Sequence, residues 1–364
     1  MAMNKIRVLV VDDTALYRKI IRDVLSDFSE VDVVGSAPNG KIALSKIETL
    51  KPDLITLDQE MPEIDGMETL RQIKARNLNV AAIMVSAHTT KGAKITVQAL
   101  DLGAFDFIAK PDSNDINTNI DSLKTQFGPK IEALQNRLGK RPASTEPVPE
   151  PIRTLAQAAP LTPEKGLGIK GKPKIVAFGV STGGPKALAE VIPRIPATIG
   201  VPIVIVQHMP PVFTKALADS LDKKSQIKVV EGMDGQILQA GTAYIAPGGK
   251  QMKIAAGPGG TNLHLVITDD APENHCKPAV DYLFRSVSNV YPGYSLAVIM
   301  TGMGRDGTLG LRLLKRQGAH VLAQNESTCV VYGMPMEAIK AGVVDEVLPL
   351  SSIAGKITGI IGSN

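Results

Sequence analysis

The sequence is poor in residues that define several protein classes, and each shortage narrows what the chain can be. It contains no tryptophan and only 4% aromatic residues. Its two cysteines, Cys276 and Cys329, are too few for a disulfide framework, which favours a reducing cytoplasm. No apolar run approaches the roughly 18 residues of a membrane span, and the apolar run near the N-terminus is too short for a signal peptide. We therefore expect a cytoplasmic protein without membrane insertion.

Charge of one sign is not concentrated in any block of the chain. The 364 residues include 40 Lys and Arg against 36 Asp and Glu, for a net charge of +4. No segment is basic enough to indicate a nucleic-acid partner. The length allows two domains, and prolines without apolar periodicity between residues 139 and 173 indicate a connector. We expect one domain over residues 1–125, a helix and proline-rich linker over 126–173, and a second domain over 174–364.

The first domain alternates apolar runs with helical patterns. This alternation predicts an α/β fold in which a parallel sheet is covered by helices on both faces, a doubly wound (βα)5 arrangement. The expected strands cover residues 6–11, 31–36, 54–57, 81–85 and 105–108, and the expected helices cover residues 15–28, 40–50, 67–75, 92–102 and, closing the domain, 116–138.

Five chemically active side chains follow the ends of these strands. They are Asp12, Asp13, Asp58, Ser86 and Lys110. Three carboxylates at one sheet edge repel one another unless a cation joins them, and hard oxygen ligands favour Mg²⁺. The lysine adds a positive charge and the serine a hydroxyl. A single aspartate at a strand end is best explained as a solvated loop residue, but the five together predict a site that receives a phosphoryl group.

The first domain resembles a response-regulator receiver domain over its whole length. The motifs that carry the resemblance are VVDD at 10–13, LDQEMPEIDG at 57–66, SAHT at 86–89 and AKP at 109–111. The resemblance implies that Asp58 accepts a phosphoryl group from a histidine kinase and that Phe107 is the aromatic switch residue. It also implies a magnesium-binding set of Asp12, Asp13 and Asp58 and a phosphoryl-contacting set of Ser86 and Lys110.

The second domain opens with the stretch KIVAFGVSTGGPKAL at 174–188. An apolar run at 175–178 predicts a buried strand, and a helical pattern follows at 186–191. Between them, a G-x-S-x-G spacing would place Ser181 on a tight turn, with its hydroxyl open to a substrate and a helix N-terminus behind it. A glycine-rich turn that holds a phosphate, or one that only ends a strand, is the alternative.

Two further strands supply the partners that a serine nucleophile needs. His208 ends the run at 201–207, and Asp306 lies in a glycine-rich turn after the run at 295–300. A hydroxyl needs an imidazole to take its proton and a carboxylate to orient that imidazole. His275 competes for the role of base, but it follows a polar loop and not a buried strand. We therefore expect Ser181, His208 and Asp306 to meet at one sheet edge.

The order Ser, His, Asp along the chain differs from that of α/β-hydrolases, so we expect a different fold that uses similar chemistry. A doubly wound, mostly parallel sheet remains the best fit, with an appended antiparallel hairpin formed by residues 241–247 and 263–268. We expect both cysteines to be structural, His88, His264 and His320 to be incidental, no Cys/His zinc cluster, and no cofactor for hydrolysis.

The second domain resembles the protein-glutamate methylesterase (CheB) family of bacterial chemotaxis over roughly all of 174–364. The matching segments are GVSTGGPKAL, IVIVQHMPPVFT, GTAYIAPGG, CKPAVDYLFRSV, MTGMGRDGTLGL and VVYGMPMEA. The resemblance implies hydrolysis of glutamate γ-methyl esters on chemoreceptor helices and deamidation of receptor glutamines. It implies these roles: Ser181 as nucleophile, His208 as general base and acid, Asp306 as its orienting residue, and backbone N–H groups near Thr182 and Met303 as the oxyanion hole.

Two other functions stay open from the sequence alone. One is a receiver-gated esterase that acts on another acyl substrate, because loops that the sequence does not place would shape the pocket. The other is a non-catalytic module that docks on a receptor under the control of phosphorylation. In the esterase readings, we expect the first domain to restrain the second until Asp58 is phosphorylated.

Overall fold

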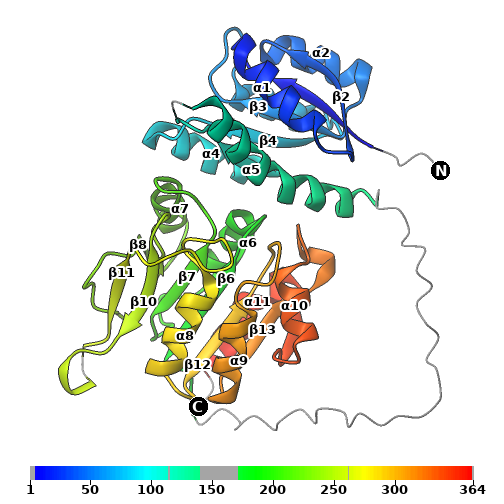
Figure 1. Ribbon diagram of the computed structural model, residues 1–364. Helices are drawn as coiled ribbons and strands as arrows, with labels where there is room; N and C mark the ends of the chain where they lie inside the picture. The colour runs from blue at the N-terminus through cyan, green and yellow to red at the C-terminus, as the bar shows by residue number, and fades with distance from the viewer. Residues whose placement is uncertain (1–4, 114, 140–170, 261, 363–364) are drawn as a thin grey trace, which may run out of the picture.

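The computed structural model describes residues 5–113, 115–139, 171–260 and 262–362. Residues 140–170, most of the proline-rich connector expected from the sequence, lie outside the described residues. Two sheets, each covered by helices on both faces, lie one above the other, and the helices α4 and α5 of the first part face α6 and α7 of the second (Figure 1). Among the described helices, none has the length and apolarity that a membrane crossing requires.

The first sheet is parallel throughout and has the order β2-β1-β3-β4-β5. This confirms the doubly wound arrangement expected from the alternating pattern. The strands are β1 Ile6–Val11, β2 Val31–Ala37, β3 Leu54–Asp58, β4 Ala81–Ser86 and β5 Asp106–Ala109, and the helices are α1 Ala15–Ser26, α2 Gly40–Leu50, α3 Gly66–Ala75, α4 Thr90–Leu102 and α5 Ile116–Arg137.

Helix α5 closes the first part of the molecule. It begins after Asp115, whose carboxylate accepts hydrogen bonds from the backbone N–H groups of Asn117 and Thr118 and so caps the helix. Its apolar face, with Phe127 and Ile131, packs into the same core cluster as strands β1 and β4. The boundary expected after residue 125 therefore falls inside α5, which contributes Phe127 and Ile131, beyond that boundary, to this core cluster.

The second sheet is also parallel and has the order β14-β13-β12-β6-β7-β9-β8. Its central strand β6 is buried at every position, which is why the stretch reads as a continuous apolar run. The strands are β6 Ile175–Val180, β7 Ile203–Gln207, β8 Lys228–Glu231, β9 Thr242–Ile245, β12 Ser295–Ile299, β13 His320–Gln324 and β14 Glu346–Leu348. The helices are α6 Gly184–Val191, α7 Phe213–Asp222, α8 Val280–Val290, α9 Thr308–Arg316, α10 Met334–Lys340 and α11 Leu350–Gly362.

The appended hairpin exists, but one of its strands is not the one expected. Residues 242–245 form β9, which pairs in parallel with β7 and β8 inside the main sheet. The hairpin pairs β10 Gln251–Ala255 with β11 His264–Thr268. All four residues of β9 are buried, as in a strand covered on both faces, whereas β10 and β11 are each partly exposed. The glycine turns at 257–260 lie between the two hairpin strands.

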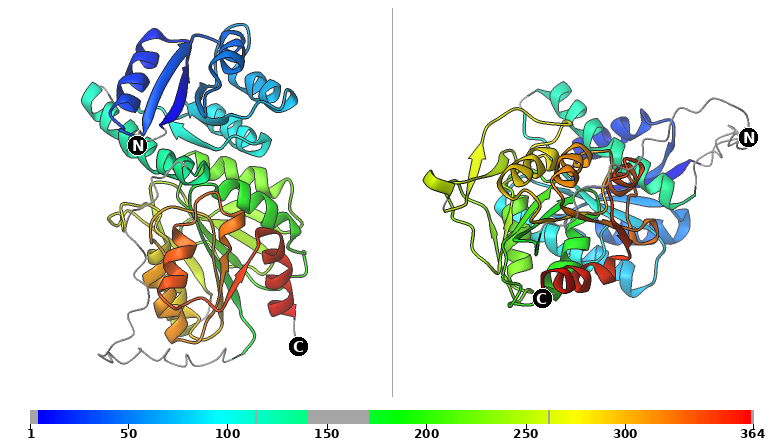
Figure 2. Two further views of the ribbon diagram at one scale, coloured as in Figure 1. Left: turned by 90° about the vertical axis from the view of Figure 1, so that its right-hand side faces the viewer. Right: turned by 90° about the horizontal axis from the view of Figure 1, so that it is seen from below.

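Figure 2 shows the two parts of the molecule lying against each other through their helices, and aromatic side chains from both parts take part in this contact. The Phe107 ring stacks on Phe213 at the start of α7, with 4.6 Å between ring centroids. The His88 ring also stacks on Phe213, with 5.9 Å between ring centroids, and its Nε2 lies 2.9 Å from the carbonyl oxygen of Pro211. His88 is therefore an interface residue and not incidental. The sequence does not reveal this, because its partners are more than 100 positions away.

Candidate functional sites

The acidic cluster of the first sheet forms where the strands end. Asp12 and Asp13 follow β1 and Asp58 ends β3, and their carboxylate oxygens lie within 4.8 Å of one another. Lys110 follows β5, and its Nζ lies 2.9 Å from an oxygen of Asp12 and 2.8 Å from one of Asp58. Ser86 ends β4 and is buried. The structure thus brings all five expected residues to one edge.

The electrostatics of this cluster suit a divalent cation. Burial raises the pKa of Asp58 to about 6; the charge of Lys110 opposes this rise and the charge of Asp12 adds to it. One lysine does not offset three carboxylates, so the cluster keeps an excess of negative charge. Asp12, Asp13 and Asp58 supply hard carboxylate oxygens, the donors that Mg²⁺ prefers. These residues therefore fit a magnesium site.

The turn that carries Ser181 follows β6 and is held from two sides. The Ser181 backbone N–H donates to the carbonyl oxygen of Thr301 at 3.0 Å, and Gln207 Nε2 donates to the Ser181 carbonyl oxygen at 2.9 Å. Gly183 has φ +76°, a left-handed conformation that other residues resist. A Cβ at Gly179 would lie 2.4 Å from a methyl carbon of Val280. The glycines of the motif are thus required by the turn and by close packing.

His208 and Asp306 meet at the carboxyl edge of the second sheet. His208 follows β7, and its Nε2 lies 2.8 Å from Oδ2 of Asp306, which follows β12. Asp306 is buried and accepts five hydrogen bonds, from the His208 ring, from Asn274 Nδ2 and from the backbone N–H groups of Val280, Asp281 and Gly307.

These contacts set the charge of the pair. Burial alone would raise the pKa of Asp306, but the hydrogen bond and charge of His208, together with the backbone donors, hold it below its usual value. Burial alone would lower the pKa of His208, but the hydrogen bond to Asp306 and the contact with Cys276 raise it to about 9. The pair is therefore stabilised as carboxylate and imidazolium.

One cavity of about 500 Å³ joins these groups. Its lining includes Ser181, Thr182, His208 and Met303 from the second part of the molecule and Phe107 and Lys130 from the first. In the described part of the chain, no hydrogen bond joins the side chains of Ser181 and His208, and the backbone N–H groups of Thr182 and Met303 donate to no other residue. Within the described residues, neither N–H group is therefore already used in a backbone hydrogen bond. Catalytic hydrogen bonds are often long without substrate and tighten when it binds.

The sequence analysis missed Cys276. Its Sγ lies 3.5 Å from His208 Nδ1, and Cys276, His208 and Asp306 each place a potential ligand atom within 4.8 Å of the others. The sequence does not show that these three side chains lie together, and the expectation that the chain has no Cys/His zinc cluster stays a prediction. Cys276 lies in a loop before α8 and not at a strand end, so strand patterns do not place it. His275 lines the same cavity, but in the described residues Asp306 is bonded to His208 and not to His275.

The fold and these two sites together define a class of protein: a hydrolase domain, built on a parallel sheet covered by helices, that is linked to a receiver domain. Residues 176–357 match the family described as CheB methylesterase, and residues 8–121 match the response regulator receiver domain. A protein from Desulfotalea psychrophila, named protein-glutamate methylesterase/protein-glutamine glutaminase, is 50% identical over 358 residues, 98% of each chain. A protein of the same name from Bacillus subtilis is 45% identical over 360 residues, again 98% of each chain.

A solved structure agrees with these relatives. The CheB methylesterase catalytic domain from Thermotoga maritima is 41% identical, with a TM-score of 0.50, and the match covers 52% of this chain and 100% of that one. The chain belongs to the CheB methylesterase family, and it carries a response-regulator receiver domain before the catalytic domain.

Proposed function

We propose that this chain is a phosphorylation-activated hydrolase that removes methyl groups from glutamate γ-methyl esters on chemoreceptor helices and deamidates receptor glutamines. The observation that carries the proposal is the His208–Asp306 pair, 2.8 Å apart, in one cavity with Ser181. The names of relatives up to 50% identical over the full chain support the same activity. Its partners would be a chemotaxis histidine kinase and methylated receptor helices in the cytoplasm.

The catalytic residues act in two stages. Ser181 Oγ attacks the ester carbonyl while His208 takes the serine proton at the nitrogen that Asp306 does not hold. The N–H groups of Thr182 and Met303 stabilise the oxyanion, and His208 then returns the proton to methanol as it leaves. Water, which gives a proton to His208, attacks the resulting acyl-enzyme; the bond between the acyl carbon and Ser181 Oγ breaks, and His208 returns the proton to Oγ, which releases glutamate and free Ser181. A glutamine follows the same path and releases ammonia.

The receiver would be phosphorylated on Asp58. One oxygen of this carboxylate attacks the phosphorus of the donor, and Lys110 and Ser86 bind the transferred phosphoryl oxygens. Asp12, Asp13 and Asp58 would hold Mg²⁺, which supplies the positive charge that the transfer needs. The domain division at 1–125, 126–173 and 174–364 remains part of this proposal.

The receiver would restrain the hydrolase by covering its cavity. Phe107 and Lys130 line the cavity from the receiver side, and the Phe107–Phe213 stack and the His88–Pro211 contact hold the two parts together. Phosphorylation of Asp58 would draw Ser86 toward the phosphoryl group, and His88 is two residues further along the chain. A small movement there weakens the interface and favours the open state.

The experiment that tests this function is methanol release from membranes that carry methylated chemoreceptors, with and without a small-molecule phosphodonor. We expect release that the phosphodonor stimulates. Release from simple methyl esters but not from receptors would favour an esterase for another acyl substrate. Receptor binding without any hydrolysis would favour the docking module.

A further inference from the structure

The mechanism above leaves the thiol of Cys276, which lines the cavity, without a role. Cys276 is half-buried beside the catalytic imidazole, with its Sγ 3.5 Å from His208 Nδ1. The opposite ring nitrogen, Nε2, is held by Asp306. The nitrogen that would take the proton from Ser181 is therefore the one that faces a thiol.

This spacing matches that of two ligands on one zinc ion. In a tetrahedral site, Zn–S bonds of about 2.3 Å and Zn–N bonds of about 2.0 Å place sulfur and nitrogen about 3.5 Å apart. The observed separation of Cys276 Sγ and His208 Nδ1 is 3.5 Å. Both residues line the 500 Å³ cavity, which has room for water to complete the coordination of a bound ion.

In this site, Asp306 would orient the His208 ring and would not itself bind the metal ion. Its two oxygens already accept five hydrogen bonds, one of them from His208 Nε2. A metal-binding histidine commonly donates its second N–H to a carboxylate, which fixes the ring and strengthens the ligand nitrogen. The Asp306–His208 bond supplies that arrangement before any ion arrives.

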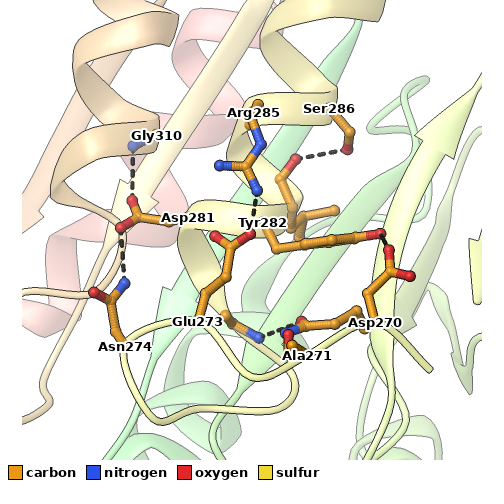
Figure 3. Close-up of polar contacts among 12 residues, drawn as sticks. Asp270, Ala271, Glu273, Asn274, Asp281, Tyr282, Arg285, Ser286 and Gly310 are labelled. Atoms are coloured by element: carbon orange, nitrogen blue, oxygen red, sulfur yellow. Dashed lines mark hydrogen bonds and ion pairs between the residues drawn. The ribbon is translucent and has the colours of Figure 1, made fainter. Parts of the chain in front are cut away.

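The loop that carries Cys276 is held in place by contacts to α8 and to its own backbone. Three side-chain pairs tie it to the helix: Tyr282 with Asp270, Arg285 with Glu273, and Asn274 with Asp281 (Figure 3). The backbone groups of Glu273 and Cys276 also bond to each other in both directions, at 2.8 and 3.1 Å. The thiol is thus fixed beside the imidazole.

We propose that Cys276 and His208 form a binding site for a borderline-soft divalent metal ion, with Zn²⁺ as the best fit, and that the bound ion stops hydrolysis. Because His208 is protonated at neutral pH, binding breaks the Cys276 S–H bond and the His208 Nδ1–H bond, releases two protons to solvent and forms one S–Zn and one N–Zn bond. His275, which lines the same cavity, offers a further imidazole. With Nδ1 occupied, His208 can no longer take the serine proton. The inhibitory effect rests on the function proposed above, whereas the binding itself does not.

Binding can be measured without any activity assay. Co²⁺ replaces Zn²⁺ as a probe, because a thiolate bound to Co²⁺ gives a charge-transfer absorption in the near ultraviolet. The full chain is titrated with Co²⁺ in excess Mg²⁺, which occupies the hard oxygen ligands of the receiver. The absorption should appear in the wild type and in the matched control Cys329→Ser, and it should be absent in Cys276→Ser and Cys276→Ala. Absorption that persists in both Cys276 variants, or that never appears in the wild type, would overturn the site.

Inhibition is measured by methanol release at increasing Zn²⁺ concentration and one fixed pH. Each Cys276 variant should need at least tenfold more Zn²⁺ for half-inhibition than the wild type and Cys329→Ser, and a chelator should restore activity. Equal sensitivity of all four proteins would disprove inhibition through Cys276. If the wild type shows no hydrolysis in the absence of zinc, the proposed function fails, and the cobalt absorption still decides the metal site.

Discussion

Asp58 and Asp306 are both buried carboxylates at the carboxyl ends of parallel strands, yet their surroundings shift their pKa values in opposite directions. Asp58 accepts bonds from Lys110 and from the backbone N–H of Gln59 and lies beside Asp12, and burial raises its pKa to about 6. Asp306 accepts five hydrogen bonds beside His208, and its pKa is lowered although burial opposes this. The number of donors and the sign of the neighbouring charge, and not burial alone, decide which state the protein stabilises. The first environment suits a group that gains a cation and a phosphoryl group, and the second suits one that must remain charged.

The largest expected effect is the loss of one activity, ester hydrolysis, while the other activity, phosphorylation, is kept. Ser181→Ala should reduce methyl-ester hydrolysis by about 10⁴- to 10⁶-fold, because the attacking oxygen is lost. It should leave Mg²⁺-dependent phosphorylation of Asp58 unchanged. Methanol release and incorporation of phosphate from a small-molecule donor measure the two activities. Ser351→Ala, an exposed serine on α11, is the matched control. Near-normal hydrolysis by Ser181→Ala would refute the mechanism.

The second prediction compares the same isosteric change at both aspartates. Asp306→Asn should lower the free energy of unfolding by about 2–4 kcal/mol, because backbone donors lose a charged acceptor. Asp58→Asn should raise it by about 1–3 kcal/mol at pH 7 without Mg²⁺. The sign follows because a raised carboxyl pKa destabilises the folded state above about pH 6 and has no effect below the unfolded value of 3.8.

Urea unfolding followed by circular dichroism, with the wild type as reference, measures both changes. The Asp58→Asn gain should disappear well below pH 3.8, where the wild-type carboxyl is protonated in both states. A loss of stability in both variants at pH 7 would show that the folded protein stabilises the ionised carboxylate at both positions, which contradicts the prediction for Asp58.

The third prediction concerns the pH dependence of hydrolysis. A ring with a pKa of about 9 is mostly protonated at pH 7 and cannot accept the serine proton. The kcat/KM for ester hydrolysis should therefore rise about tenfold per pH unit from pH 7 and level off near pH 9. The stability that His208 contributes should be complete below pH 6.5 and decrease as the pH rises through 9. A flat rate profile between pH 7 and 9 would show that the ring is already neutral.

The smallest expected effect tests whether the receiver domain lowers the rate of hydrolysis by the second domain. Cutting the chain between residues 142 and 170 and keeping the second domain should raise basal hydrolysis about tenfold, which corresponds to about 1.4 kcal/mol of interface free energy. His88→Ala in the full chain should raise it less, and His264→Ala, on the distant hairpin, serves as its control. Phosphodonor should stimulate the full chain but not the fragment. A fragment no faster than the unphosphorylated chain would leave direct stimulation by the receiver as the explanation.

Much of both sites could be predicted because parallel strands end at a common edge. Asp12, Asp58 and Lys110 each follow an apolar run of the sequence, and the structure places them together, as it does His208 and Asp306. The pattern of apolar residues in the sequence therefore predicts the position of a functional residue when that residue lies at the end of a strand.

The features that the sequence did not predict lie in loops or between domains. Cys276 reaches His208 from a loop whose shape depends on side-chain contacts with α8, and His88 reaches Pro211 across the interface. The hairpin was misplaced because β9 and β10 are both short and largely apolar, and only the tertiary structure decides which of them enters the main sheet. Such contacts join distant residues and leave no periodic signal in the sequence.

The pairing of β6 with β12 has a consequence for how the protein is made on the ribosome. The strand before Ser181 is central to its sheet, but its neighbour β12, which leads to Asp306, is synthesised much later. At about 5–20 residues per second, Asp306 emerges on the order of 10 s after Ser181. Domains that emerge first generally fold first, so the receiver is complete before the catalytic edge can assemble. On this order of synthesis, the sheet edge that carries Ser181, His208 and Asp306 is completed only after the receiver has emerged.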